Sequence, residues 1–223
     1  MNKITKLVIS VNTPVGIKRR SLLNYKFTHI DGCKKAPKWI VDNFKRLHTE
    51  NPKSILLKNR MACFASHVKA LKYVVKNKIN RVIILEDDAF LDGLVIESLP
   101  KDGATLLGGV IRHPTRWELD KEFINTKAKK IINKFKNGVN EIDYKKYRWN
   151  GAWAIYYPTW KIVKQILDFI LSKNFKFKHY DLFLANHKLI KYLYYPSIFT
   201  HDDSRSISQV SSNKSGYIKN YIF

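Results

Sequence analysis

The sequence contains only two cysteines, Cys33 and Cys63, in 223 residues. Two thiols cannot form a disulfide framework or supply the ligands of a four-cysteine zinc site. Residues 1–6 lack the apolar core of a signal peptide, and no apolar run approaches the about 18 residues that a membrane-spanning helix needs. We therefore expect a cytoplasmic protein in which Cys63 packs as a small core residue.

Acidic residues are also scarce: 18 Asp and Glu accompany 41 Lys and Arg, which gives a formal charge of +23. Such a balance suits a basic nucleic-acid-binding protein, whose affinity comes largely from phosphate contacts, and we keep this function as an alternative. The lysines are, however, spread along the whole sequence without a nucleic-acid-binding motif, so we expect no dedicated nucleic-acid partner. The positive field would instead attract a nucleotide diphosphate and favour peripheral contact with an acidic membrane.

No Pro-, Gly- or Ser-rich linker divides the chain, and internal repeats and low-complexity tracts are absent from the sequence. A chain of this length can bury a substantial core, so we expect a single domain. Apolar segments typical of strands alternate with amphipathic segments typical of helices. This alternation favours the α/β class, with a mostly parallel Rossmann-type sheet flanked by helices.

An abrupt change from apolar to acidic residues marks the most informative segment. Residues 82–85 are Val-Ile-Ile-Leu, and Glu86, Asp87 and Asp88 follow directly. The apolar run predicts a buried parallel strand, and ligands bind at the carboxyl ends of such strands. Because packed carboxylates repel one another, a hard divalent cation, Mg²⁺ or Mn²⁺, is expected to balance them. The alternative is a solvated acidic turn.

The segment before this strand predicts an amphipathic helix over residues 59–77. Phe64, Val68, Leu71 and Val75 recur at spacings of three and four residues, with lysines on other faces. A short polar link then leads into the acidic strand.

Together these two segments resemble glycosyltransferase family 25, which includes bacterial lipooligosaccharide and collagen galactosyltransferases. The resemblance rests on Arg60, the Cys63-Phe64-Ala65-Ser66-His67 run and the Leu85-Glu86-Asp87-Asp88-Ala89 strand end. Weaker similarities lie at residues 8–12, at Arg19-Arg20, and at residues 27–32, 152–157 and 179–181. The family usually has Gly-Glu-x-Gly before the cysteine, where this chain has Asn59-Arg60-Met61-Ala62.

The resemblance implies a GT-A-like fold and transfer of a sugar from a nucleoside-diphosphate donor, a UDP-sugar, to a hydroxyl of a glycan or glycolipid. It also implies inversion at the anomeric carbon, with Asp181 as the general base. Residues 1–110 would form the donor-nucleotide half and residues 111–223 the acceptor-side half. The alternative role for Asp181 is a helix cap or first-turn acid.

Other candidate residues follow from position and chemistry. Asn12 lies in a polar loop suited to a nucleotide base and ribose, and Arg19 suits bidentate diphosphate binding, with a solvated basic loop as the alternative. Asp88 is the candidate metal ligand. The resemblance to GT-A transferases, in which a late His or Asp commonly completes the metal shell, implies the same role for His201, whose imidazole is an acceptable ligand. The remaining candidates are Arg60, Glu86 and Asp87 for the donor, and Trp149 and Asn150, in an aromatic-rich turn, for the acceptor sugar.

A metal-dependent phosphoesterase is a further alternative, since it also uses clustered acids. Such an enzyme usually needs additional Asp and His clusters, for which the sequence offers only His201-Asp202-Asp203.

Overall fold

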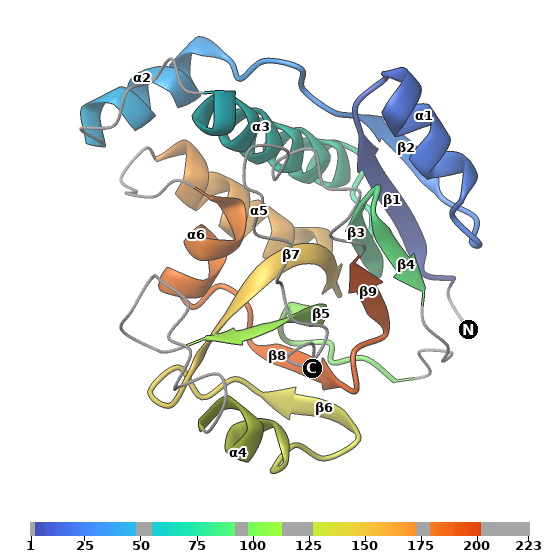
Figure 1. The fold of residues 1–223 in the computed structure, drawn as a ribbon, viewed down its shortest axis with the longest axis vertical. Coiled ribbons are helices and arrows are strands. Elements are labelled where there is room, and N and C mark those ends of the chain that lie inside the picture. The colour runs from blue at the N-terminus through green and yellow to red at the C-terminus, as the bar shows by residue number, and fades with distance from the viewer. Residues whose placement is uncertain (1–2, 48–54, 92–97, 113–126, 173–178, 202–223) are drawn as a thin grey trace.

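The computed structural model describes residues 3–47, 55–91, 98–112, 127–172 and 179–201 (Figure 1). Its elements are β1 (Thr5–Ser10), α1 (Pro14–Ser21), β2 (Thr28–Asp31), α2 (Lys38–Leu47), α3 (Ile55–Lys76), β3 (Val82–Glu86), β4 (Ala89–Leu91), β5 (Thr105–Arg112), α4 (Lys129–Ile132), β6 (Gly138–Glu141), β7 (Arg148–Tyr157), α5 (Trp160–Leu171), α6 (Tyr180–Asn186), β8 (Tyr192–Tyr195) and β9 (Phe199–His201). Strands and helices alternate through much of the chain, which confirms the α/β prediction.

A seven-stranded sheet forms the centre, with strand order β2-β1-β3-β7-β5-β8-β6. Five strands, β2, β1, β3, β5 and β8, run in one direction, whereas β7 and β6 run in the other. The mostly parallel, Rossmann-like sheet is therefore confirmed. The antiparallel β7 lies between β3 and β5, where it pairs with both neighbours.

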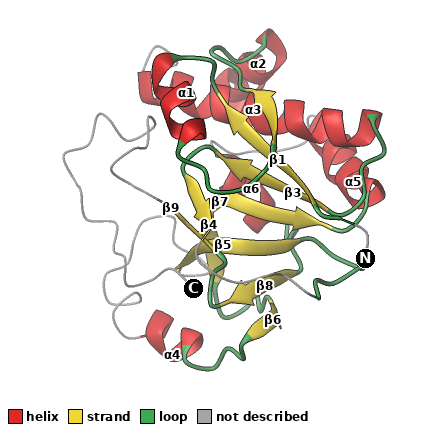
Figure 2. Cartoon of the chain, turned by 90° about the vertical axis from the view of Figure 1, so that its right-hand side faces the viewer, coloured by secondary structure: helices red, strands yellow, loops and turns green. Residues whose placement is uncertain are grey.

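The two faces of the sheet are covered differently. Figure 1 shows α3, α5 and α6 together on one face, where they enclose the larger apolar core. The other face is covered by the two-stranded β4–β9 sheet and by residues that follow α1. Successive residues of β1 point to opposite faces, so Leu7 and Ile9 join the helix-side core and Val8 the other. In Figure 2, α4 lies beside β6, at the end of the sheet away from α1.

The chain changes from one sheet to the other at Pro196. Strand β8 of the main sheet ends at Tyr195, and β9 begins at Phe199. Pro196 lacks the backbone N–H that a central strand needs, so the chain leaves the main sheet there and pairs with β4 instead. Among the described residues, no helix has both the length and the apolar character required to cross a membrane.

Candidate functional site

The acidic turn lies at the carboxyl edge of the sheet, as the sequence predicts. Glu86 is the last residue of β3, and Asp87 and Asp88 form the turn that leads into β4. The parallel strand β1 ends alongside, with Ile9 aligned to Glu86. This edge is where α/β sheets bind ligands.

Asp87 is held from the β1 and α1 side. The Ser10 hydroxyl donates to Asp87 Oδ2 at 2.6 Å, and Arg19 Nη1 donates to Asp87 Oδ1 at 3.2 Å. Burial raises the pKa of Asp87, while the bonds from Ser10 and Arg19 oppose this shift. Asp87 and Asp88 are both buried, which excludes the alternative of a solvated acidic turn.

The start of α1 explains how Arg19 reaches the acids. The Thr13 side chain caps the helix by accepting the Gly16 N–H at 3.2 Å, and Pro14 begins the first turn. A Cβ on Gly16 would lie 2.0 Å from the Val11 carbonyl oxygen, so a glycine is needed for α1 to approach the end of β1. Arg19, one turn later, is buried as a result.

Arg19 is therefore not on a solvated loop. Its guanidinium lies 3.2 Å from Asp87 and 4.0 Å from Asp88, so its nearest anions are the protein's own carboxylates. The neighbouring Arg20 donates to the Ser10 hydroxyl at 2.8 Å. Asn12 lies in the loop between β1 and α1 and is exposed. The structure thus brings the predicted donor-side residues Asn12 and Arg19 to the same sheet edge as the acids.

The turn is also fixed at Ala89. The Tyr25 hydroxyl donates to the Ala89 carbonyl at 2.9 Å, and burial, then the charges of Asp88 and Asp87, raise the pKa of Tyr25. In the β4–β9 sheet, Ala89 pairs with His201. The backbone of the predicted metal ligand His201 is therefore opposite the residue that follows Asp88. Asp202 and Asp203 lie outside the described residues.

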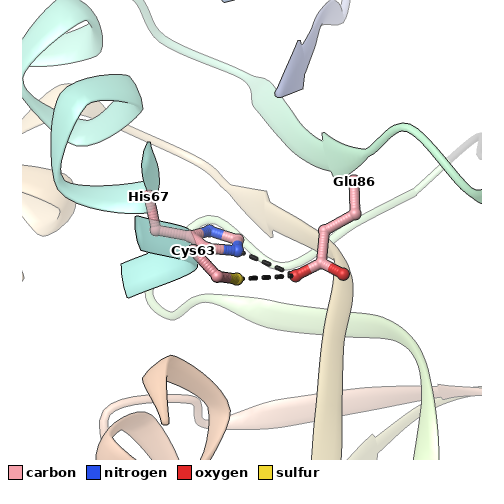
Figure 3. Close-up of side chains that lie close together, drawn as sticks. All are labelled: Cys63, His67 and Glu86. Carbon is pink, nitrogen blue, oxygen red and sulfur yellow. Dashed lines mark hydrogen bonds and ion pairs between the residues drawn. The ribbon is translucent and has the colours of Figure 1, made fainter. Parts of the chain in front are cut away.

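Glu86 faces α3 instead of α1. Figure 3 shows Cys63 and His67, one helical turn apart on α3, directed at the Glu86 carboxylate. His67 Nε2 lies 3.0 Å from Glu86 Oε1, and the Cys63 thiol donates to the same oxygen at 3.8 Å. Arg60 lies three residues before Cys63 and seven before His67, hence on the same face of α3.

The prediction that Cys63 is a core residue is wrong, because its side chain is exposed. Its flanking neighbours Ala62 and Phe64 are buried, so Cys63 lies at the edge of the packed helix face. Surrounding protein atoms still restrict its hydration and raise the pKa of the thiol. The negative charges of Glu86, Asp181 and Asp88 raise it further.

This electrostatic effect links residues far apart in the sequence. Asp181, at the start of α6, and Asp88, after β3, both act on the Cys63 thiol. The His67 ring stacks on Tyr180 with centroids 4.0 Å apart and planes inclined by 12°, which fixes the start of α6 against α3. The two acids predicted to serve different steps, Asp88 and Asp181, thus both raise the pKa of one α3 thiol.

Asp181 lies in the first turn of α6, after the N-cap residue His179. Its Oδ2 accepts the Gly151 N–H of β7 at 2.9 Å, and its Oδ1 accepts the Leu182 N–H at 2.7 Å. Asp181 is therefore a first-turn acid of α6, the structural role that the sequence left open as an alternative, and it also joins α6 to β7. A role as base remains a prediction.

The predicted acceptor residues have different surroundings. Trp149 has no exposed surface, and its indole N–H donates to the Tyr144 hydroxyl at 3.1 Å. A fully enclosed ring cannot stack on a sugar, so the prediction for Trp149 is corrected to a core role. Asn150, the next residue of β7, is only partly buried and pairs with Val110 of β5.

Three residues at the site were not identified from the sequence. Ser10 ends β1 beside the acids, and the strand-end rule used for Glu86 also applies to it. His67 was part of the Cys-x-x-Ser-His run, but no role was assigned to it. Tyr25 follows α1 without a motif or a periodic pattern, so no sequence signal points to its bond with Ala89.

The family model of glycosyltransferase family 25, described as an LPS biosynthesis protein family, matches residues 17–157. The match extends from α1 to the end of β7 and includes Arg19, Arg60 and the acidic turn, whereas Asp181 and His201 lie beyond it. No curated protein matches the chain. Because the model matches more than half of the sequence, the chain belongs to glycosyltransferase family 25 and is a glycosyltransferase.

Proposed function

We propose that the protein transfers a sugar from a UDP-sugar to a hydroxyl of a glycan or glycolipid, with inversion at the anomeric carbon and with Mn²⁺ or Mg²⁺ as cofactor. The donor-nucleotide half comprises residues 1–110, in a GT-A-like arrangement, and the acceptor-side half residues 111–223. The positive charge of the chain favours peripheral contact with an acidic membrane that carries the acceptor.

The observation that carries this proposal is the buried acidic turn at the carboxyl edge of the sheet, in a chain that belongs to glycosyltransferase family 25. An inverting transferase needs one charge-balancing group at the leaving diphosphate and one carboxylate at the attacking hydroxyl. Asp88 lies in the turn after β3 and Asp181 at the start of α6, and His67 of α3 stacks on Tyr180, the residue before Asp181. This arrangement supports a role for Asp88 at the leaving diphosphate and for Asp181 at the attacking hydroxyl.

The donor set at the acidic turn fits a hard cation. Asp87 and Asp88 offer carboxylate oxygens, which Mg²⁺ and Mn²⁺ prefer, and the Arg19 guanidinium lies closer to Asp87 than to Asp88. Asp88 would hold the ion, together with His201, whose backbone lies opposite Ala89. When bound, the ion would neutralise charge that develops on the leaving diphosphate.

The protein's own residues would bind and orient the substrates. Arg19 and Arg20 bring positive charge to the end of β1, where the diphosphate would lie, and Asn12 in the adjoining loop would bind the base and ribose. Glu86 and Arg60 would be further donor-binding residues. Asn150 is placed on β7 next to Gly151, whose N–H bonds Asp181, so it would orient the acceptor hydroxyl towards this carboxylate.

Asp181 would take the proton of the attacking hydroxyl. Both of its oxygens accept backbone N–H groups, which fix the orientation of the carboxylate. A general base needs such a defined position relative to the proton that it abstracts.

A thermal-shift screen of nucleotide sugars with and without Mn²⁺ tests the donor class, because a ligand that binds the native state raises the melting temperature. We expect one UDP-sugar to raise it only in the presence of the metal. NMR of the product formed with that donor should then show an inverted anomeric configuration. Retained configuration would overturn the inverting mechanism, and phosphoester hydrolysis without an acceptor would favour a phosphoesterase.

A further inference from the structure

A second group of potential metal ligands lies on the α3 side of the acidic turn. The ligand atoms of Cys63, His67 and Glu86 all lie within 4.8 Å of one another (Figure 3). Cys63 and His67 are four residues apart on α3 and therefore project from the same helix face. Glu86, at the end of β3, supplies the third atom from across the gap between helix and sheet.

The chemistry of this group differs from that of the aspartates. It combines a sulfur, an imidazole nitrogen and a carboxylate oxygen, all of which Zn²⁺ accepts as ligands, whereas Mg²⁺ and Mn²⁺ favour oxygen. Zinc bonds of about 2.0–2.3 Å in a tetrahedron place ligand atoms roughly 3.3–3.8 Å apart. The observed separations from Glu86 Oε1, 3.0 Å to His67 Nε2 and 3.8 Å to Cys63 Sγ, are close to that range.

The surroundings hold His67 in place and leave Cys63 accessible. His67 is almost completely buried, and its ring stacks on Tyr180, so its orientation is fixed by packing. Cys63 is exposed, so an ion can enter from solvent. With three protein ligands, a water molecule would supply the fourth, which is the pattern of zinc sites that are not purely structural.

The geometry points to a Zn²⁺ site formed by Cys63, His67 and Glu86, separate from the Mg²⁺ or Mn²⁺ site proposed at Asp88. Binding replaces the proton of the Cys63 thiol by a sulfur–metal bond and releases that proton to solvent. The hydrogen bond between His67 and Glu86 gives way to two metal bonds. The ion then joins α3 to the end of β3, and because it binds only the folded arrangement it stabilises the protein.

Co²⁺ titration of the full chain, after chelator treatment and with a phosphine reductant, tests this site. Co²⁺ is a spectroscopic substitute for Zn²⁺, and a thiolate ligand gives it a sulfur-to-metal charge-transfer band. We expect this band to reach its end point at one equivalent and to disappear when Zn²⁺ is added. Cys63→Ser should abolish the band, whereas Cys33→Ser, at the other cysteine, should retain it.

Two further variants make the result specific. Glu86→Gln should weaken Co²⁺ binding while the charge-transfer band persists at higher metal concentration, because the thiolate remains. Asp88→Asn should leave the end point unchanged, since Asp88 belongs to the other site. Circular dichroism checks that each variant is folded, and Cys63→Ala replaces Cys63→Ser if the latter is not. A wild-type protein without the band, or a band that survives in folded Cys63→Ser, overturns the zinc site.

Discussion

The two sides of the acidic turn give adjacent carboxylates different burial and different bonding partners. On the α1 side, Asp87 is buried and bonded by Ser10 and Arg19. On the α3 side, Glu86 is partly exposed and contacts Cys63 and His67. Glu86 ends the strand and Asp87 begins the turn, so a single step along the chain separates two chemical environments.

This difference shows how one strand end can serve two purposes. The α1 side consists of oxygen atoms and guanidinium groups, and its burial makes each of its bonds important for stability. The α3 side combines sulfur and nitrogen with an exposed opening, which suits ligand exchange better than rigid support. The comparison therefore predicts large stability effects on the first side and small ones on the second.

The largest effect is expected when the α1 side is broken. Arg19→Met leaves the Asp87 carboxylate buried without its ion-pair partner, so the free energy of unfolding should fall by about 3–5 kcal/mol in urea denaturation. Arg20→Met, which removes only the bond to Ser10, should cost about 1 kcal/mol.

Adding Asp87→Asn to Arg19→Met should recover part of the loss, because the buried negative charge is then removed. Equal stability losses in the two arginine variants would contradict the distinct role of Arg19.

The next effect concerns turnover. Asp181→Asn should lower kcat by about 10²-fold or more, since the variant cannot accept the acceptor's proton, while donor affinity changes little. Initial-rate kinetics with saturating donor measure this, and Asp168→Asn, an exposed acid on α5, is the matched control. Normal turnover in Asp181→Asn would reduce Asp181 to its structural bonds with Gly151 and Leu182.

A smaller effect is expected in the core beside the acceptor side. Trp149→Phe removes the hydrogen bond to Tyr144 and some packing volume, so thermal or urea unfolding should show a loss of about 1–2 kcal/mol. Because the ring is enclosed, the KM for the acceptor should not change. A raised acceptor KM without a loss of stability would restore the sugar-binding role that the sequence suggests.

The smallest effect is expected on the α3 side. Glu86→Gln keeps an oxygen that can accept from His67, and the residue is partly exposed, so without added metal the free energy of unfolding should change by about 0.5–1 kcal/mol. Urea denaturation of Glu86→Gln and Arg19→Met under the same conditions compares the two losses of stability directly. A loss as large as that of Arg19→Met would mean that both sides are equally rigid.

The sequence was sufficient for features that depend on local patterns. The apolar run before Glu86 predicted a buried strand end, and the spacing of Phe64, Val68 and Leu71 predicted α3. These predictions succeed because periodicity reports directly which residues a strand or helix buries.

Features that depend on distant partners could not be predicted. Arg19 and Asp87 are 68 residues apart, and their pairing depends on the close approach of α1 to β1. Trp149 looked available for a sugar because the sequence does not show that the folded chain encloses its ring completely. The helix pattern also did not show that the helix-side packing stops short of Cys63.

We propose that Asp88 holds a hard divalent ion on which donor binding depends. Calorimetric titration of UDP into wild-type protein and Asp88→Asn, each with Mn²⁺ and with a chelator, tests this role. We expect binding by the wild type only when Mn²⁺ is present, and no binding by folded Asp88→Asn under either condition. Equal affinity of the two proteins, or wild-type binding that is unchanged by the chelator, would contradict it.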